Sequence, residues 1–187
     1  MTPAPTDARE RLIAAAQQLY AADGVAATTP RQVLARSGIG QGSLYHHFPA
    51  KRDLAAAAVA RTAQEALDTA TAPLTADAPA HDRVLGYLRR DRDAVAGCRV
   101  GRLTADPLVM SDEELRGAVG DYFTGLIDAL TAAFAAEGLA PVAARDRATT
   151  AAAVIQGGYV LSRALGDPTH MRRAVDGLVD LLDGDAG

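Results

Sequence analysis

The chain has 187 residues, of which 49% are hydrophobic and 22% charged, a composition that fits one or two ordinary globular domains. Its single cysteine, Cys98, excludes an internal disulfide framework and fits a protein of the reducing cytoplasm. No run approaches the roughly 18 uninterrupted apolar residues of a membrane-spanning helix, and Met1–Thr6 lacks the features of a signal peptide. We therefore expect a cytoplasmic protein with no membrane partner.

Charge is divided unevenly along the chain, although the net charge is only −4. Residues 1–61 hold seven Lys and Arg against four Asp and Glu, whereas residues 62–187 hold twelve against nineteen. A basic excess at one end is typical of a part that neutralises nucleic-acid phosphates. Because this excess is small, one copy should bind DNA weakly, and two copies would act together.

The first helix is expected after a short tail. Met1–Thr6 contains two prolines and no apolar anchor, so it should lack regular structure. Asp7 and Glu10 would cap a helix that runs to Ala22. Apolar residues at helical spacing form its core-facing side: Leu12, Ile13, Ala16, Leu19 and Tyr20. Two basic residues at its start are candidates for phosphate contacts: Arg9 and Arg11.

A short helix with strong boundary signals is predicted from Pro30 to about Ser37. Thr29 is a typical N-cap, and Pro30 suits the first helical position because its missing N–H costs nothing there. Gln32 lies three residues after Thr29 and would close a capping box. Gly38 would adopt the left-handed conformation that ends this helix.

A second short helix is predicted from about Gly40 to His47, before Pro49. Helix, turn and helix together form a helix-turn-helix, whose second helix enters the DNA major groove. Apolar residues would hold the two helices together: Val33, Ile39, Leu44 and Phe48. Polar or amphipathic residues remain to face a groove: Gln41, Ser43, Tyr45 and His46. Gln pairs well with adenine edges, and Lys51 is placed for a phosphate contact.

Helices with apolar faces account for most of the remaining chain. The sequence predicts them at residues 50–72, 79–96, 111–137, 141–165 and 168–182, with a loop over Thr71–Ala80. Ser111 and Glu114 would form a capping box at the start of the third of these helices. Gly157 and Gly158 predict a kink in the fourth or a close approach by another helix.

Two segments before residue 102 have competing interpretations. Arg89–Asp93 is expected to be a solvated face with local ion pairs, in preference to a second nucleic-acid patch. Gly97–Gly101 most simply combines tight turns with a small buried cysteine. A thiol sensor at Cys98 would need a resolving cysteine or a lowered pKa, and the chain has no second cysteine.

The motifs from Arg9 to Leu54 resemble the TetR/AcrR family of bacterial transcriptional repressors. The resemblance lies in Asp23-Gly24-Val25, Thr28-Thr29, Ser37-Gly38-Ile39, Gly42-Ser43-Leu44-Tyr45-His46-His47-Phe48 and Pro49-Ala50-Lys51. It implies an all-α protein with a three-helix helix-turn-helix head at residues 1–50 and a ligand-binding and dimerisation body at residues 51–187. It also implies a homodimer formed through the last two helices, which would place two heads on a palindromic operator in double-stranded DNA.

The DNA-contacting residues that follow from the motif and its chemistry are Thr29, Arg31, Gln41, Ser43, Tyr45, His46 and Lys51. We expect Arg31, Gln41 and Ser43 at or beside base edges, and the other four mainly at phosphates. The resemblance further implies a small, mostly apolar effector that binds in the body. Candidate lining residues for it are Val59, Leu67, Tyr87, Leu103, Val119, Tyr122, Phe123, Ile155 and Tyr159. The Gly-Cys-x-x-Gly pattern is similar to that of a branch that regulates multidrug efflux and flavonoid response in Gram-positive bacteria.

An enzyme is disfavoured, and no cofactor or metal is expected. Ser43, His46 and His47 lie in one short helix that already has a DNA-reading explanation, and no nucleophile elbow surrounds Ser43. Adjacent histidines on a helix cannot share one metal ion, and no phosphate-binding loop is present in the sequence. The remaining alternative is a helical module that binds a protein or a small molecule without binding DNA. It differs from a DNA reader in lacking a steep salt dependence.

Overall fold

The structure, a computed structural model, describes residues 5–184, with side chains from Ala8 onward. Within this range the chain is helical and contains no strand, as predicted for an all-α protein. It forms two compact units. The first unit comprises the residues up to Glu65 together with Arg99–Asp121, and the second unit comprises Ala66–Cys98 together with the residues from Tyr122 onward. No helix in the described range is long and apolar enough to span a membrane.

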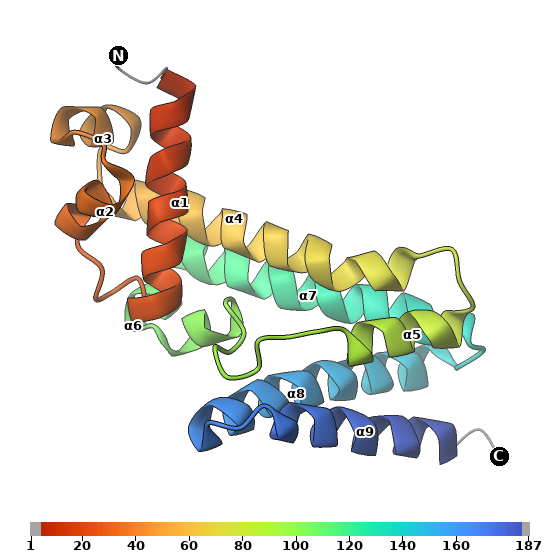
Figure 1. Ribbon diagram of the computed structural model, residues 1–187. Coiled ribbons are helices and arrows are strands. Elements are labelled where there is room, and N and C mark those ends of the chain that lie inside the picture. Colours follow the sequence, from red (N-terminus) through yellow and green to blue (C-terminus); the bar gives the residue numbers. More distant parts are fainter. Residues whose placement is uncertain (1–4, 185–187) are drawn as a thin grey trace. The chain divides into compact units, whose positions relative to one another are not determined.

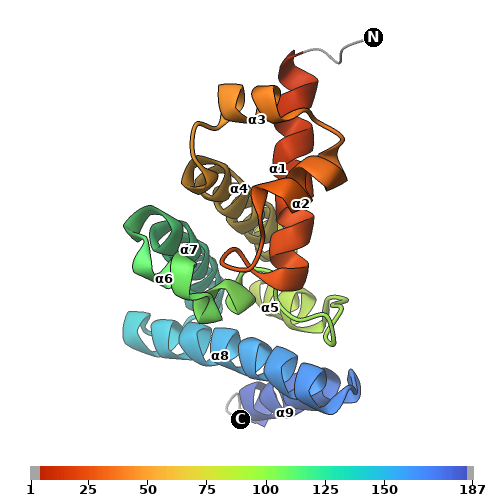
Figure 2. The same cartoon turned by 90° about the vertical axis from the view of Figure 1, so that its left-hand side faces the viewer.

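Three helices begin the first unit: α1 (Pro5–Asp23), α2 (Pro30–Ser37) and α3 (Gln41–His47), with α2 and α3 packed beside α1 (Figure 2). The predicted capping box is confirmed, because the Gln32 amide donates to Thr29 Oγ1 while Gln32 Oε1 accepts from the Thr29 amide at 2.7 Å. Gly38 ends α2 with a φ of 66°, in the left-handed region. The predicted helix-turn-helix core is also buried, namely Val33, Ile39, Leu44 and Phe48.

The start of α1 differs from the prediction. Met1–Ala4 lie outside the described residues, whereas Pro5 and Thr6 of the expected tail are already helical. Proline is well tolerated in the first turn, where its missing N–H would have no helical partner. Asp7 therefore lies inside the first turn and not at the cap. The Glu10 carboxylate instead accepts hydrogen bonds from Arg61 at 2.6 and 3.0 Å, which lowers the pKa of Glu10.

The next helix is α4 (Lys51–Thr71), followed by the 3₁₀ turn η1 (Ala72–Thr75) and by α5 (Ala80–Arg89). The prediction of one helix through residue 96 was wrong, since α5 stops at Arg89 and Arg90 is extended. The Arg92 side chain explains this end, because it donates to the carbonyls of Leu88 and Arg90 at 2.8 and 2.9 Å. These bonds satisfy carbonyls that a continuing helix would have used.

Gly97 has a φ of +88°, which confirms the expected turn. The segment after it contains two short elements that were not predicted from the sequence. They are the 3₁₀ turn η2 (Gly101–Ala105) and α6 (Pro107–Ser111). The long helix α7 (Glu113–Ala136) then follows, and its N-cap is Asp112 and not Ser111. Asp112 Oδ1 accepts the amides of Glu114 and Leu115, whereas Ser111 Oγ donates to Leu108 within α6. The predicted capping box between Ser111 and Glu114 was therefore wrong: α6 already includes Ser111, and Asp112 caps α7 with no returning bond, because the third helical residue is Leu115.

The second unit ends in an antiparallel helix pair, α8 (Pro141–Leu165) and α9 (Thr169–Gly184), drawn in blue in Figure 1. Gly166 turns the chain with a φ of 65°, and the buried Ser162 hydroxyl accepts the Met171 amide at 3.0 Å. The two glycines differ in their surroundings. A Cβ on Gly158 would lie 2.7 Å from Met171 Sδ, whereas a Cβ on Gly157 would meet no atom within 4 Å. Gly158 therefore fulfils the prediction of a close approach by another helix.

Candidate nucleic-acid interface

The capped start of α2 carries two of the predicted DNA-contacting residues. Thr29 is exposed, and its hydroxyl and amide both engage Gln32, which fixes the chain direction at the first turn. Arg31 is exposed and makes no hydrogen bond or ion pair with any residue of the described chain. Its guanidinium is therefore available for an acceptor outside the protein.

The short helix α3 separates a buried side from a polar one. Leu44 is 3% exposed and anchors the helix, while Gln41 and His46 are exposed, Tyr45 is 47% exposed and Ser43 is half-buried. The Gln41, Ser43 and Tyr45 side chains have no hydrogen-bonding partner among residues 8–184. The His46 ring meets the His47 ring edge-on at 5.1 Å. Because Gly40 offers no side-chain cap, the first amides of α3 also remain open to an acceptor.

Lys51 lies at the first position of α4 and is half-buried. Its ammonium donates to the Ala26 carbonyl at 3.3 Å, which ties the start of α4 to the loop between α1 and α2. A lysine ammonium has three N–H donors, so this bond leaves two for a phosphate.

Sequence reasoning missed the side chains that hold this loop. Asp106, the N-cap of α6, accepts the Val25 and Ala26 amides with Oδ2 at 2.6 and 3.0 Å. Its other oxygen accepts the Leu108 and Val109 amides at 3.0 and 3.3 Å. An aspartate followed by a proline was a visible cap signal, but nothing in the sequence indicated a partner 81 residues away.

Three arginines of the first unit have structural roles. The sequence predicted another role for Arg11 and none for the other two. Arg11, expected at a phosphate, donates to the Ser37 carbonyl at 2.6 Å and thereby closes the end of α2. Arg102 donates to the Ala21 and Ala22 carbonyls at the end of α1. Arg52 binds Asp112 at 2.6 and 3.1 Å and Glu114 at 2.9 Å, which joins the starts of α4 and α7.

The residues predicted to line an effector pocket are divided between the two units. Val59, Leu103 and Val119 are buried in the first unit. The other six belong to the second unit: Leu67, Tyr87, Tyr122, Phe123, Ile155 and Tyr159. Leu67 packs on Gly125, where a Cβ would lie 2.9 Å from Leu67 Cδ2. Tyr122 and Phe123 meet edge-on, with ring centroids 4.9 Å apart.

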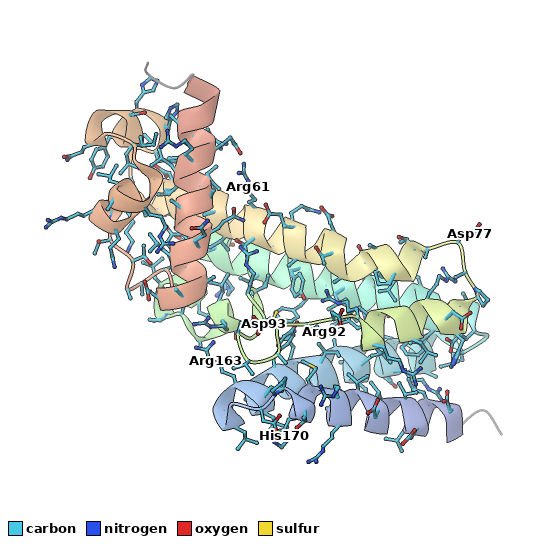
Figure 3. The ribbon with its side chains drawn as sticks, viewed as in Figure 1. Arg61, Asp77, Arg92, Asp93, Arg163 and His170 are labelled. Carbon is cyan, nitrogen blue, oxygen red and sulfur yellow. The ribbon has the colours of Figure 1, made fainter. Side chains whose placement is uncertain are left out.

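Three of these residues are tyrosines of the second unit whose electrostatic neighbours include Arg90. Burial raises the pKa of Tyr87, although the neighbouring Arg92 and Arg90 charges oppose this shift. Burial likewise raises the pKa of Tyr159, and that of Tyr122 beside the Cys98 thiol. Burial lowers the pKa of Arg92. The expected solvated face of Arg89–Asp93 was therefore wrong at Arg92, whose guanidinium is half-buried and bonded to backbone (Figure 3).

The described part of the second unit contains cavities at two of its edges. One, of about 310 Å³, is formed by the segment after α5 and the start of α9. The other, of about 370 Å³, is lined by His81, Phe134, Glu137 and Arg147 among others. Burial raises the pKa of Glu137, whose Oε1 lies 3.8 Å from His81 Nδ1. Within the described residues, no three His, Cys, Asp or Glu side chains are grouped as a metal site.

The chain is similar to bacterial transcriptional regulators over most of its length. The profile of the bacterial regulatory proteins of the tetR family matches residues 12–58, and that of the LmrA/YxaF-like transcriptional regulator C-terminal domain matches residues 83–176. The transcriptional regulator LmrA of Bacillus subtilis is 26% identical over 183 residues, which cover 94% of this chain and 97% of that protein. YxaF of the same organism is 28% identical over 173 residues, covering 88% and 90%.

Solved structures show the same fold. The crystal structure of reduced NemR from E. coli superimposes with a TM-score of 0.80 at 22% identity, covering 91% of this chain and 95% of that one. A TetR transcriptional regulator from Chloroflexus aurantiacus gives 0.81 at 23% identity, covering 96% of each chain. With a helix-turn-helix profile and a regulator-specific C-terminal profile on one all-helical chain, the protein belongs to the TetR family of DNA-binding transcriptional regulators and has an LmrA/YxaF-like C-terminal domain.

Proposed function

We propose that the protein is a homodimeric repressor that leaves a palindromic operator when a small, mostly apolar molecule binds in its body. The observation that carries the DNA-reading part is the polar side of α3, held by the buried Leu44 and followed by the anchored Lys51. Gln41 and Arg31 are exposed and have no partner in the described part of the chain. A relative in Mycolicibacterium smegmatis, 37% identical over 77 residues, is named as the transcriptional repressor KstR2.

In this proposal the polar side chains divide into two roles. Arg31, Gln41 and Ser43 read or adjoin base edges in the major groove, where guanidinium and amide groups make bidentate bonds. Thr29, Tyr45, His46 and Lys51 hold phosphates and set the register of α3. The head comprises residues 1–50 and the effector-binding and dimerisation body residues 51–187. As a DNA-binding regulator, the protein would act in the cytoplasm.

Dimerisation through α8 and α9 is supported by apolar side chains left uncovered on these two helices. Val142, Val160, Leu161, Leu165 and Leu181 are between 49% and 74% exposed. Four of them lie on α8, and Val160, Leu161 and Leu165 recur at helical spacing beside Gly157. A second copy that brings the same helices would bury these side chains in a symmetric four-helix interface.

The effector acts in this scheme by favouring a dimer whose heads no longer match the half-site spacing. Candidate lining residues are the nine predicted from the sequence, of which Tyr87, Tyr122 and Ile155 are the most buried in the second unit. A ligand changes DNA affinity only as far as it binds the two states differently.

The test is a selection of bound fragments from random duplex DNA with the purified full-length chain at moderate salt. We expect an enriched inverted repeat with two equal half-sites, and affinity that falls steeply as salt rises. A single enriched half-site would reject the palindromic dimer. Recovery of no sequence, together with binding that is indifferent to salt, would reject the operator and favour a helical module without DNA binding.

A further inference from the structure

The cavity of about 310 Å³ in the second unit carries an unusual concentration of positive charge. Four arginines line it, Arg89, Arg90, Arg92 and Arg172, against two aspartates, Asp91 and Asp176. The second unit as a whole has the opposite balance, with nine arginines and thirteen Asp and Glu. A ligand responds mainly to the charges next to it and not to the net charge of the whole unit. A cavity with net positive charge therefore favours an anion, even in an acidic unit. We refer to it as the arginine cavity.

Arg92 and Arg90 share an aromatic neighbour but differ in their hydrogen bonds. Arg92, labelled at the carboxyl end of α5 in Figure 3, donates to the carbonyls of Leu88 and Arg90 and is thereby committed to the backbone. Both guanidinium groups lie over the Tyr87 ring, with Cζ 5.7 Å from the ring centroid for Arg90 and 5.2 Å for Arg92. No hydrogen bond or ion pair engages the Arg90 guanidinium within the described residues.

The Arg90 side chain is therefore positioned but not satisfied. Its Nε is buried and lacks an acceptor, like that of Arg92, but its two terminal nitrogens, unlike those of Arg92, also have no hydrogen-bond partner within the described residues. A guanidinium attracted to an aromatic face does not use its N–H groups in that contact, so the terminal N–H groups of Arg90 can bind a planar acceptor. A carboxylate is the acceptor that matches this fork, through two parallel bonds. The cavity aspartates do not fill that role, since neither forms an ion pair in the described chain.

The rest of the cavity wall is apolar. Leu88, Met171 and Val175 are buried residues that line it, and they come from α5 and α9. A volume of about 310 Å³ lies at the small end of the range of ligand pockets, about 300–1,000 Å³. This combination fits a compact molecule with one acidic group and an apolar remainder.

We propose that the arginine cavity binds a small organic carboxylate, whose acid group pairs with Arg90 and whose apolar part contacts Leu88, Met171 and Val175, and that such an acid is the effector. The effector role rests on the proposed function as a regulator that a ligand releases from DNA. It specifies that the small, mostly apolar effector carries one acid group. Tyr87, one of the lining residues predicted from the sequence, takes part indirectly, because its ring lies under the Arg90 guanidinium.

The binding test uses 4-phenylbutyrate and its neutral counterpart, 4-phenylbutyramide, with the full chain in isothermal titration calorimetry. We expect the acid to bind and the amide to bind at least about tenfold more weakly, because only the acid makes charge-assisted bonds. Arg90→Met keeps the stem of the side chain and should weaken acid binding by about the same factor. Arg172→Met, at an exposed cavity position, provides a second variant should Arg90→Met not fold.

Arg173→Met is the matched control, because Arg173 is the exposed neighbour of Arg172 on α9 and does not line the cavity. It should change the affinity for the acid by less than about twofold. Three outcomes would each overturn the arginine cavity as a carboxylate site. The first is equal affinity for acid and amide, and the second is no binding of the acid at millimolar concentration. The third is that Arg172→Met and Arg173→Met have equal effects while Arg90→Met binds the acid as the wild type does.

A separate titration distinguishes failure of this inference from failure of the proposed function. The acid should weaken binding of the selected DNA duplex by about fivefold or more, as measured by fluorescence anisotropy. If the acid binds through Arg90 and DNA affinity does not change, the effector role is overturned while the DNA-binding function stands. If the protein binds no duplex even without the acid, the proposed function fails, and calorimetry still decides whether the cavity binds carboxylates.

Discussion

Gln41 and Lys51 are two polar side chains of the first unit that differ in what they contact. The Gln41 side chain is exposed and has no partner in the described residues, whereas the Lys51 ammonium donates to the Ala26 carbonyl. A base-reading amide discriminates among sequences, whereas a phosphate-binding ammonium acts on all sequences alike. The two positions therefore permit a direct comparison.

Replacing Gln41 by Ala should cost about 1–3 kcal/mol at one base pair of the operator and leave other sequences little affected. Replacing Lys51 by Ala should weaken binding to every duplex and reduce the slope of affinity against salt by about one. Both are measured by anisotropy on the selected duplex and on single-base variants of it. A uniform loss with Gln41→Ala would show that Gln41 does not read a base.

Asp106 is the side chain whose loss should affect the first unit most. Its two carboxylate oxygens accept four backbone amides, two in the loop after α1 and two at the start of α6. In Asp106→Asn one oxygen becomes an amide nitrogen that faces backbone donors. We expect a loss of about 1–3 kcal/mol in the free energy of unfolding, measured with urea. Asp121→Asn, an exposed control on α7, should change it by no more than about 0.5 kcal/mol. Equal losses would contradict this role.

At the scale of elements, α4 and α7 are joined at their starts by Arg52, Asp112 and Glu114. The Asp112 carboxylate also caps α7, through the Glu114 and Leu115 amides. The Arg52 hydrogen bond, followed by that of the Leu115 amide, lowers the pKa of Asp112 below its ordinary value of 3.8.

This shift gives a signed dependence on pH. Because the folded-state pKa is lowered, the stabilising contribution is fully present above pH 3.8 and is lost as pH falls through the folded-state value. The melting temperature of Asp112→Asn should therefore lie below that of the wild type at neutral pH and approach it on acidification. Asp121→Asn, matched in charge change, should keep a constant difference from the wild type. A gap for Asp112→Asn that stays constant down to acid pH would refute the ion pair as its cause.

The ends of the helices are set by glycines, by capping residues and by arginine side chains that bond to backbone carbonyls. These three kinds of signal are not equally easy to recognise in the sequence. The capping signals at Thr29, Gly38 and Gly166 were correct to the residue, because each acts within its own turn. The predicted end of α5 was wrong, because the Arg92 side chain donates to the Leu88 and Arg90 carbonyls. The hydrophobic periodicity alone predicts that the helix continues past these residues. Periodicity reports which side of a helix is apolar but not where a side chain takes over its hydrogen bonds.

At the scale of the whole molecule, the exposed apolar side chains of α8 and α9 predict that one chain is not the complete regulator. Leu161 is 49% exposed near the middle of this set. A glutamate there would have to be desolvated in the dimer, at a cost of several kcal/mol.

Leu161→Glu should therefore raise the dimer dissociation constant by at least about 100-fold, as measured by sedimentation velocity over a range of concentrations. DNA affinity should fall with it, because a single head has little positive charge. Met110→Glu, at a 37% exposed position on α6 in the first unit, is the control and should remain dimeric. A Leu161→Glu protein that stays folded and dimeric would place the interface elsewhere.

The sequence by itself determined the all-helical fold, the helix-turn-helix with its caps, and the family, since these depend on signals within one or two turns of the chain. Only the tertiary structure revealed the Asp106 contacts with Val25 and Ala26, the structural use of Arg11 and Arg92, and the arginine cavity. Those features join residues far apart in the sequence, or reverse the usual preference of arginine for solvent. The hydrophobic periodicity of the sequence indicates neither the distant contacts nor the half-buried arginines. A polar side chain contributes to that pattern in the same way whether it contacts water, a backbone carbonyl or a ligand.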